Sequence, residues 1–141
     1  MSVTFEKVLV LKNIPLFAEV SELALSDLIA VCEEKNYDAG DVIVQANHPS
    51  PYLYMILSGS VQLQDGGKII QELQARQVFG DTTVMSDLPF PQTAAAREKT
   101  VLLRVRGDQL YRMMALHPTL AYGFIGSLSK RIRQEENKNN S

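Results

Sequence analysis

The residues best suited to chemistry lie between positions 79 and 94, and the first of them combine a glycine with an acid and two hydroxyls. In order they are Phe79, Gly80, Asp81, Thr82 and Thr83. Glycine accepts a positive φ angle and lets the backbone approach a ligand closely. Successive free N–H groups in such a turn form a concave site for an anion. This end of the segment therefore predicts a small-anion cradle.

The other end of the segment is rich in small side chains. Pro91, Gln92 and Thr93 precede three alanines at positions 94–96, and small side chains leave room for a ligand. A serine, an aspartate and two prolines between positions 86 and 91 are typical of a loop. A surface turn with a proline-rich corner explains the same residues, because glycine-containing motifs match often by chance. Both interpretations stay open on this segment alone.

The composition is that of one globular domain. The 141 residues are 45% hydrophobic and 21% charged, which suffices for one core but not for two domains. The net charge of −2 gives no electrostatic reason to expect nucleic-acid binding.

No apolar run approaches the roughly 20 residues that span a bilayer, and the N-terminal residues do not resemble a signal peptide. A single cysteine, Cys32, fits a reducing cytoplasm, which is the location we expect.

Two helices are expected in the first third of the chain. The first covers residues 2–11 and ends before Pro15. Its inward-facing side chains are expected to be Phe5, Val8, Leu9 and Leu11. The second follows Ser21, a favourable N-cap, and runs to about residue 34. Its buried face is expected to consist of residues at helical spacing, namely Leu25, Leu28, Ile29 and Cys32.

From residue 35 the apolar side chains alternate instead of following helical spacing. Short apolar runs at 42–44, 52–63, 69–73 and 101–105 are separated by turn signals, among them Gly59 and the pair Gly66 and Gly67. Many short strands at close spacing predict a mainly β domain, either a sandwich or a jelly roll. We expect it to occupy about residues 36–106.

Two further helices are expected at about residues 108–135, with Asp108 capping the first. Pro118 suits the first turn of the second helix, which we expect to end near Gln134. The polar residues 136–141 predict a disordered tail, so the folded domain is expected to span residues 1–135.

The long last helix carries an apolar stripe that either docks on the sandwich or pairs with a second copy of the chain. The stripe consists of Ala121, Ile125, Leu128 and Ile132. Three basic residues near its end, Lys130, Arg131 and Arg133, are interpreted as a solvated face, since cations are favoured at a helix C-terminus.

In series, these features resemble the cyclic nucleotide-binding domain family, which includes catabolite activator protein and the regulatory subunits of cAMP-dependent kinase. The family's phosphate-binding cassette reads F-G-E and then P-R-[ST]-A. Here residues 79–81 read Phe-Gly-Asp and residues 91–94 read Pro-Gln-Thr-Ala. A Gly-Asp pair at 40–41 and the apolar run at 54–61 also follow the family's order. The resemblance covers about residues 11–133.

The resemblance implies a jelly roll with N-terminal helices and a C-terminal lid helix, and a ligand site in the cassette. In the family, the glutamate bonds the ribose 2′-hydroxyl and the arginine pairs with the cyclic phosphate. Asp81 is one methylene shorter than glutamate, and Gln92 carries no positive charge. We therefore expect cAMP and cGMP to bind weakly or not at all, while another small anion stays possible. The implied ligand-binding residues are Phe79, Gly80, Asp81, Thr82, Thr83, Gln92, Thr93 and Ala94.

Two arginines are candidates to replace the cationic charge that Gln92 lacks. Arg76 lies in the turn before the cassette, and Arg97 follows the cassette. A guanidinium at either place could form the charge-assisted bond to a phosphate. The alternative, which we favour for Arg76, is an exposed turn residue.

No constellation of residues indicates an enzyme. The two histidines, His48 and His117, have no metal-ligand spacing, and no nucleophile with its base is recognisable. We therefore expect a regulatory ligand-sensing domain in which ligand capture alters the position of the C-terminal helix. The alternative is a degenerate domain of the same fold that binds no cAMP or cGMP and serves dimerisation or protein docking. The 141 residues include no recognisable DNA-binding half, so we expect either a regulatory piece of a longer protein or a stand-alone module whose output is a partner contact. The expected partner is a second copy or an attached output domain.

Overall fold

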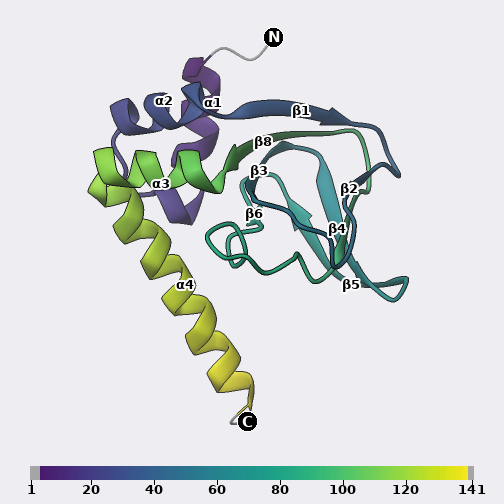
Figure 1. The fold of residues 1–141 in the computed structure, drawn as a ribbon. Helices are drawn as coiled ribbons and strands as arrows, with labels where there is room; N and C mark the ends of the chain where they lie inside the picture. The colour runs from purple at the N-terminus through teal and green to yellow at the C-terminus, as the bar shows by residue number, and fades with distance from the viewer. Residues whose placement is uncertain (1–3, 140–141) are drawn as a thin grey trace.

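The computed structural model describes residues 4–139 and shows a β-sandwich with helices gathered at one end (Figure 1). Three short helices come first: α1 (Thr4–Lys12), η1 (Pro15–Phe17) and α2 (Glu22–Ala30). The strands follow: β1 (Glu33–Tyr37), β2 (Val42–Val44), β3 (Tyr52–Ser58), β4 (Ser60–Asp65), β5 (Lys68–Gln74), β6 (Val78–Phe79), β7 (Thr93–Ala96) and β8 (Thr100–Arg106). Two helices end the described chain: α3 (Gly107–Leu116) and α4 (Pro118–Asn139).

The eight strands form two antiparallel sheets of four strands, in the orders β1-β8-β3-β6 and β2-β7-β4-β5. The chain passes from one sheet to the other between β3 and β4, where Gly59 has a φ of 90°. A side chain at Gly59 would collide with Thr100, so only glycine fits this turn. The expected jelly roll is confirmed, and its first strand begins at Glu33, slightly before the predicted boundary.

Buried side chains form two clusters on either side of the sheet β1-β8-β3-β6. The helical cluster lies between this sheet and the helices, and the sandwich cluster lies between the two sheets. Alternation along β8 explains the division, since Leu102 belongs to the sandwich cluster and Leu103 to the helical cluster. Along β3, Met55 and Ile56 divide in the same way. This sheet is therefore covered on both faces.

The first two helices agree only partly with the sequence prediction. In α1, Val8 and Leu11 are buried, but Phe5 is 67% and Leu9 is 49% exposed, so the inward placement of these two is wrong. A nine-residue helix with one covered face buries residues at a spacing of three or four. In α2, the Oγ of Ser21 accepts a hydrogen bond from the Ala24 N–H at 3.1 Å, as expected of an N-cap. That helix ends at Ala30, earlier than predicted, because β1 begins three residues later.

The C-terminal helices correct two further predictions. Asp108 is not the cap of α3, because Arg106 occupies the N-cap position and makes no side-chain capping bond. The Asp108 carboxylate lies in the first turn, where it accepts a hydrogen bond from the Gln109 N–H and complements the helix dipole. The α4 helix continues to Asn139, so residues 136–139 of the expected tail are helical. Residues 140 and 141 lie outside the described residues.

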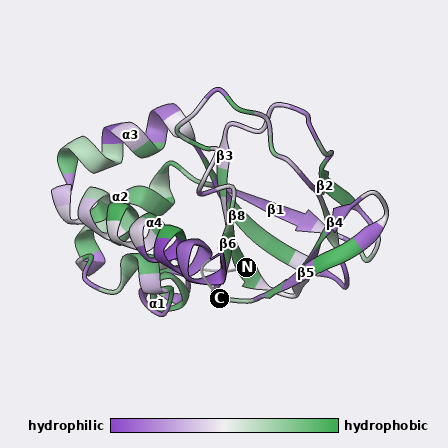
Figure 2. Ribbon diagram, turned by 90° about the horizontal axis from the view of Figure 1, so that it is seen from below, coloured by the Kyte–Doolittle hydropathy of each residue, from purple (hydrophilic) through white to green (hydrophobic). Residues whose placement is uncertain are grey.

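The α4 helix leaves the helical end of the molecule and runs past the sandwich (Figure 1). Its C-terminal part is hydrophilic, in contrast to its start (Figure 2). The buried residues that the structure describes in α4 are Leu120 and Phe124, both near its start. Gly123 lets this part touch η1, since a Cβ there would lie 2.5 Å from the Leu16 carbonyl oxygen. No helix in residues 4–139 combines the length and apolarity needed to cross a membrane.

Candidate functional site

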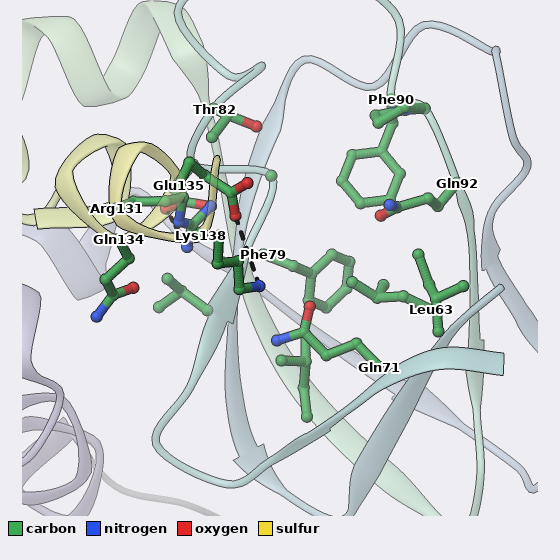
Figure 3. Close-up of a pocket in the computed structure, with 16 residues that line it drawn as sticks. Leu63, Gln71, Phe79, Thr82, Phe90, Gln92, Arg131, Gln134, Glu135 and Lys138 are labelled. Carbon is green, nitrogen blue, oxygen red and sulfur yellow. Dashed lines mark hydrogen bonds and ion pairs between the residues drawn. The ribbon is translucent and has the colours of Figure 1, made fainter. Parts of the chain in front are cut away.

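A cavity of about 620 Å³ opens between the β-sandwich and the C-terminal part of α4 (Figure 3). This volume falls within the roughly 300–1,000 Å³ of typical small-molecule sites. The sandwich side is mostly apolar, formed by Leu63, Ile70, Gln71, Leu73, Val78, Phe79, Gly80, Asp81, Thr82, Phe90, Pro91 and Gln92. The α4 side is polar, formed by Arg131, Gln134, Glu135 and Lys138.

The floor of the cavity is aromatic. Phe79 stacks on Tyr54 with ring centroids 4.6 Å apart and planes 8° from parallel. Phe90 meets Phe79 at a centroid distance of 6.0 Å and an angle of 57°. Gln92 lies beside Phe90 at the edge of this floor (Figure 3). An aromatic floor next to an amide suits a flat ligand that carries polar groups.

A tight turn after β6 brings Gly80, Asp81 and Thr82 to the cavity. Gly80 has a φ of 84°, and a Cβ on it would lie 2.5 Å from the Tyr52 carbonyl oxygen, so this position requires glycine. The carbonyl oxygen of Gly80 accepts from the Thr83 N–H at 3.2 Å and from the Val84 N–H at 2.8 Å. The N–H groups of Asp81 and Thr82 donate to no other described residue, which leaves them available to an anion.

Asp81 and Arg131 join the cassette to α4, although 50 positions separate them in the sequence. The Arg131 Nη1 donates to Oδ1 at 3.0 Å, and Nη2 forms an ion pair with Oδ2 at 2.8 Å, while Oδ2 accepts no hydrogen bond from the described residues. The Asp81 side chain is 4% exposed and the Arg131 side chain is 45% exposed. A carboxylate this deeply buried requires such a partner, since an unpaired charge is costly out of water.

Of the eight ligand-binding residues expected from the sequence, five line the cavity and three do not. Thr83 points to the Gly80 carbonyl oxygen, at 3.5 Å from its hydroxyl. Thr93 accepts a hydrogen bond from the Ala46 N–H at 3.1 Å. Ala94 is fully buried in β7, where it pairs with Val44 and Leu63. Phe79, Gly80, Asp81, Thr82 and Gln92 remain the candidates for direct contact.

The positions of Arg76 and Arg97 do not support a substitute cation. Arg76 is exposed in a turn with a φ of 75°, and its N–H donates to the Ile56 carbonyl oxygen at 2.9 Å. Arg97 lies 3.6 Å from the Glu72 carboxylate. Neither residue lines the cavity.

Arg131 was missed because its basic neighbours suggested a solvated helix face. The spacing of residues along α4 nevertheless predicts that Arg131 faces the domain. Phe124, Leu128 and Arg131 follow each other at four and three residues, so they share one helix face. The same face continues at the same spacing through the cavity residues Gln134, Glu135 and Lys138. A basic residue in line with buried apolar ones therefore points toward the body of the domain.

The apolar stripe predicted on α4 is divided. Leu128 packs partly against the helical cluster, and Ala121 is half-buried. Ile125 and Ile132 are 63% and 61% exposed. The docked face is centred on Leu120 and Phe124, one position before the predicted stripe. A role of the exposed isoleucines in dimerisation stays a prediction.

The single cysteine lies in the helical region, away from the cavity. Cys32 packs against the helical cluster, and burial raises the pKa of its thiol to about 12. A thiol with such a pKa stays protonated and is a poor nucleophile near neutral pH.

The chain is 28% identical over 105 residues to the cAMP-dependent protein kinase regulatory subunit of Debaryomyces hansenii, a match that covers 74% of this chain and 23% of that protein. The chain spans only 19–27% of the length of the first curated relatives that it matches.

Two solved structures share the fold at low sequence identity. The Thermus thermophilus catabolite activator protein superposes with a TM-score of 0.82 at 21% identity, over 89% of this chain and 62% of that one. The regulatory subunit of a cAMP-independent protein kinase A from Trypanosoma brucei gives 0.77 at 17% identity, over 92% and 47%. At these identities the likeness concerns the fold alone.

A family model described as the cyclic nucleotide-binding domain matches residues 34–117. This match covers more than half of the chain, runs from β1 to the end of α3, and includes the cassette. It ends before α4, so the polar wall of the cavity lies outside the matched range. Domains of this family are regulatory ligand-binding modules. The chain belongs to the cyclic nucleotide-binding domain family.

Proposed function

We propose that this chain is a regulatory ligand-sensing domain in which capture of a small ligand beside the cassette biases the position of α4. The observation that carries the proposal is the shared cavity. Its floor belongs to the sandwich, its opposite wall belongs to α4, and the Asp81–Arg131 ion pair joins the two. A ligand that contacts both sides has a different affinity for each position of α4, which is the requirement for a population shift.

The way α4 is attached supports its movement. Its buried residues, Leu120 and Phe124, lie in the first two turns, and every residue from 129 to 139 is exposed. The beginning of the helix can therefore stay docked while its end changes position. Regions with few buried contacts are those that move at low cost in free energy.

The chemistry of the cavity favours a flat ligand with an anionic or polar group. Phe79 and Phe90 supply an apolar floor, and Gln92 supplies a neutral donor and acceptor. A cyclic nucleotide has both features, and other small anions do as well. Because no arginine stands at position 92, we expect weak binding of cAMP and cGMP.

The output is proposed to be a contact with another protein and not catalysis. The exposed isoleucines of α4 are suited to a second copy of the chain, and the greater length of the relatives makes an attached output domain equally suitable. In either case the position of α4 is the signal that the partner receives. We expect the domain to act in the cytoplasm without contacting nucleic acid.

Two measurements on one protein test this proposal. Calorimetric titration with cAMP and cGMP gives the affinity, and amide hydrogen exchange of residues 129–139 gives the response of α4. We expect binding weaker than micromolar, with slower exchange of residues 129–139 when the site is saturated. Unchanged exchange at saturation would refute the coupling.

A second candidate is a degenerate domain that serves only docking or dimerisation. Two features favour it: Gln92 is neutral, and the Arg131 guanidinium is already paired with Asp81. This candidate predicts no saturable binding of either nucleotide at any accessible concentration. It also predicts self-association or partner binding that added nucleotide does not change.

A further inference from the structure

An anionic ligand in this cavity needs a cation, and the cassette does not supply one. Gln92 is neutral, and Arg76 and Arg97 do not line the cavity. Among the described lining residues, the two cationic side chains are Arg131 and Lys138, and both belong to α4. The positive charge of this site therefore comes from the α4 wall and not from the sandwich.

Of the two, Arg131 is oriented by an ion pair with the cassette residue Asp81. Its Nη1 lies 3.0 Å from Asp81 Oδ1, and its Nη2 lies 2.8 Å from Asp81 Oδ2. Lys138 is 76% exposed and lies 3.9 Å from Glu135 on the same helix (Figure 3). A planar guanidinium offers fixed donor directions, whereas an ammonium at the end of a flexible chain does not.

We propose that Arg131 is the anion-binding residue of this site and that Asp81 is its positioning residue. This inference rests on the proposed function, because it names the side chain through which α4 meets the ligand. It assigns to Asp81 a role different from the one that the family resemblance implies, in which the acid binds a ribose hydroxyl.

The geometry of the ion pair leaves Arg131 able to bind a ligand while Asp81 stays paired. A guanidinium has five N–H donors. The hydrogen bond to Asp81 engages one donor, on Nη1, while Nη2 lies in ionic contact with Oδ2. The Nε–H and at least two others remain. Asp81 is 4% exposed and Arg131 is 45% exposed, so the pair turns its positive end outward. The ligand can thus add to the pair without leaving a buried carboxylate alone.

Neighbouring groups complete an anion site around this guanidinium. The Asp81 and Thr82 N–H groups donate to no other described residue, and both residues line the cavity with Arg131. Backbone N–H groups and a guanidinium together form a suitable set of donors for phosphate or carboxylate oxygens. Binding and sensing then depend on the same side chain, because the cation is carried by the helix that responds.

The test follows the arginine Nε–H resonances by NMR while inorganic phosphate or cAMP is added at constant ionic strength. We expect the Arg131 resonance to shift saturably with both anions, while adenosine, which lacks the phosphate, leaves it in place. A charged hydrogen-bonding partner is worth about one to two orders of magnitude in affinity. Arg131→Gln should therefore weaken cAMP binding about 10- to 100-fold, and Arg131→Lys should weaken it less because it keeps the charge.

Two further variants control for disturbance of the cassette and for loss of positive charge elsewhere on α4. Arg131→Gln leaves the Asp81 carboxylate without its partner and could disturb the cassette, so the double variant Asp81→Asn with Arg131→Gln removes both charges together. It should lose anion binding and keep the native fold. Arg133→Gln, on an exposed position of the same helix, should change affinity less than twofold. A double variant with unchanged affinity, or an equal loss in Arg133→Gln, would overturn the proposal.

The outcomes separate this inference from the proposed function. If both anions shift the Arg131 Nε–H resonance but the amide hydrogen exchange of residues 129–139 does not change, the anion site stands and the coupling to α4 fails. If exchange responds to cAMP but Arg131→Gln binds as tightly as the natural chain, the coupling stands and this inference fails. Absence of a saturable Arg131 shift with either anion also overturns it.

Discussion

The two halves of α4 are held to the rest of the domain by different forces. The anchor half, residues 118–128, contributes Leu120 and Phe124 to the helical cluster. The arm half, residues 129–139, has no buried residue and meets the cassette through the Arg131–Asp81 ion pair. One half is therefore fixed by apolar burial and the other by a partly solvated charge contact.

This difference explains how one continuous helix can serve both as structure and as sensor. Full burial of an aromatic side chain such as Phe124 contributes about 1.5–3 kcal/mol. An ion pair at the surface contributes about 1 kcal/mol or less. Removing one partner costs more where the other is buried, as Asp81 is here, because the remaining charge is left unpaired. The arm can consequently change position without unfolding the anchor, and a ligand of modest affinity suffices to bias it.

Removing the anchor should have the largest effect. Phe124→Ala is expected to lower the free energy of unfolding by about 3–5 kcal/mol, because it leaves a cavity in the helical cluster. Phe5→Ala, at a position that is 67% exposed on α1, is the matched control and should change stability by less than about 0.5 kcal/mol. Urea unfolding followed by circular dichroism measures both values. A Phe124→Ala loss near that of the control would contradict the assignment of the anchor.

Adding a cation on the sandwich side should shift ligand affinity next. Gln92→Arg places a guanidinium at the edge of the aromatic floor, and a charge-assisted bond is worth roughly 1.5–3 kcal/mol. We therefore expect cAMP to bind at least tenfold more tightly by calorimetry. Gln71→Arg, on the same cavity, is the control for added charge alone and should gain less. Equal gains in both variants would mean that position 92 has no special geometry.

Weakening the ion pair should release the arm without affecting the anchor. Asp81→Asn removes the charge that holds Arg131, and a change of about 1–2 kcal/mol corresponds to a 5- to 30-fold shift in a local equilibrium. Amide exchange of residues 129–139 should accelerate by about that factor, while residues 118–128 stay as they were. Acceleration of both halves together would show that the two do not move separately.

The exposed isoleucines should matter for association and not for folding. Changing Ile125 and Ile132 together to glutamate is expected to move a dimer toward monomer in sedimentation velocity, with stability altered by less than about 0.5 kcal/mol per site. Ile69 and Ile70, which are 49% and 47% exposed on β5, provide a matched pair for the same changes. If the natural chain already sediments as a monomer at high micromolar concentration, this prediction is wrong.

The reactivity of Cys32, which packs against the helical cluster, should respond least to the ligand. Because the pKa of its thiol is raised to about 12, its alkylation should be slow at pH 8 and unaffected by ligand.

The Cys32 thiol releases its proton at lower pH in the unfolded chain than in the folded one, so folding stability should fall as the pH rises from 9 to 12. Ligand-dependent alkylation would show that the helical region moves as well.

The sandwich was predictable because its signals are local. Alternating apolar residues set the strands, the Ser21 cap set the start of α2, and Gly66 with Gly67 set the hairpin between β4 and β5. The cap of α3 was placed two positions too late because both Arg106 and Asp108 stand close to the helix start, and only the backbone geometry decides between them. Such errors of one or two residues leave the architecture unchanged.

The candidate site was predictable only where its residues are consecutive. Gly80, Asp81 and Thr82 belong to one turn, so their neighbourhood follows from the sequence. Thr93 and Ala94 could not be assigned, because the pairing of β7 with β2 and β4 decides which way each residue points. Arg131 depends on where α4 passes the sandwich, a consequence of Phe124 packing and of Gly123 against η1. Contacts across 50 positions come from assembly of the whole domain.

The central claim is that the arm of α4 responds to the occupied cavity while the anchor does not. The most direct test is amide hydrogen exchange of the Gln92→Arg protein, with and without saturating cAMP. We predict slower exchange across residues 129–139 on saturation and no change across residues 118–128. Equal exchange of the arm in the free and the saturated protein would contradict the account.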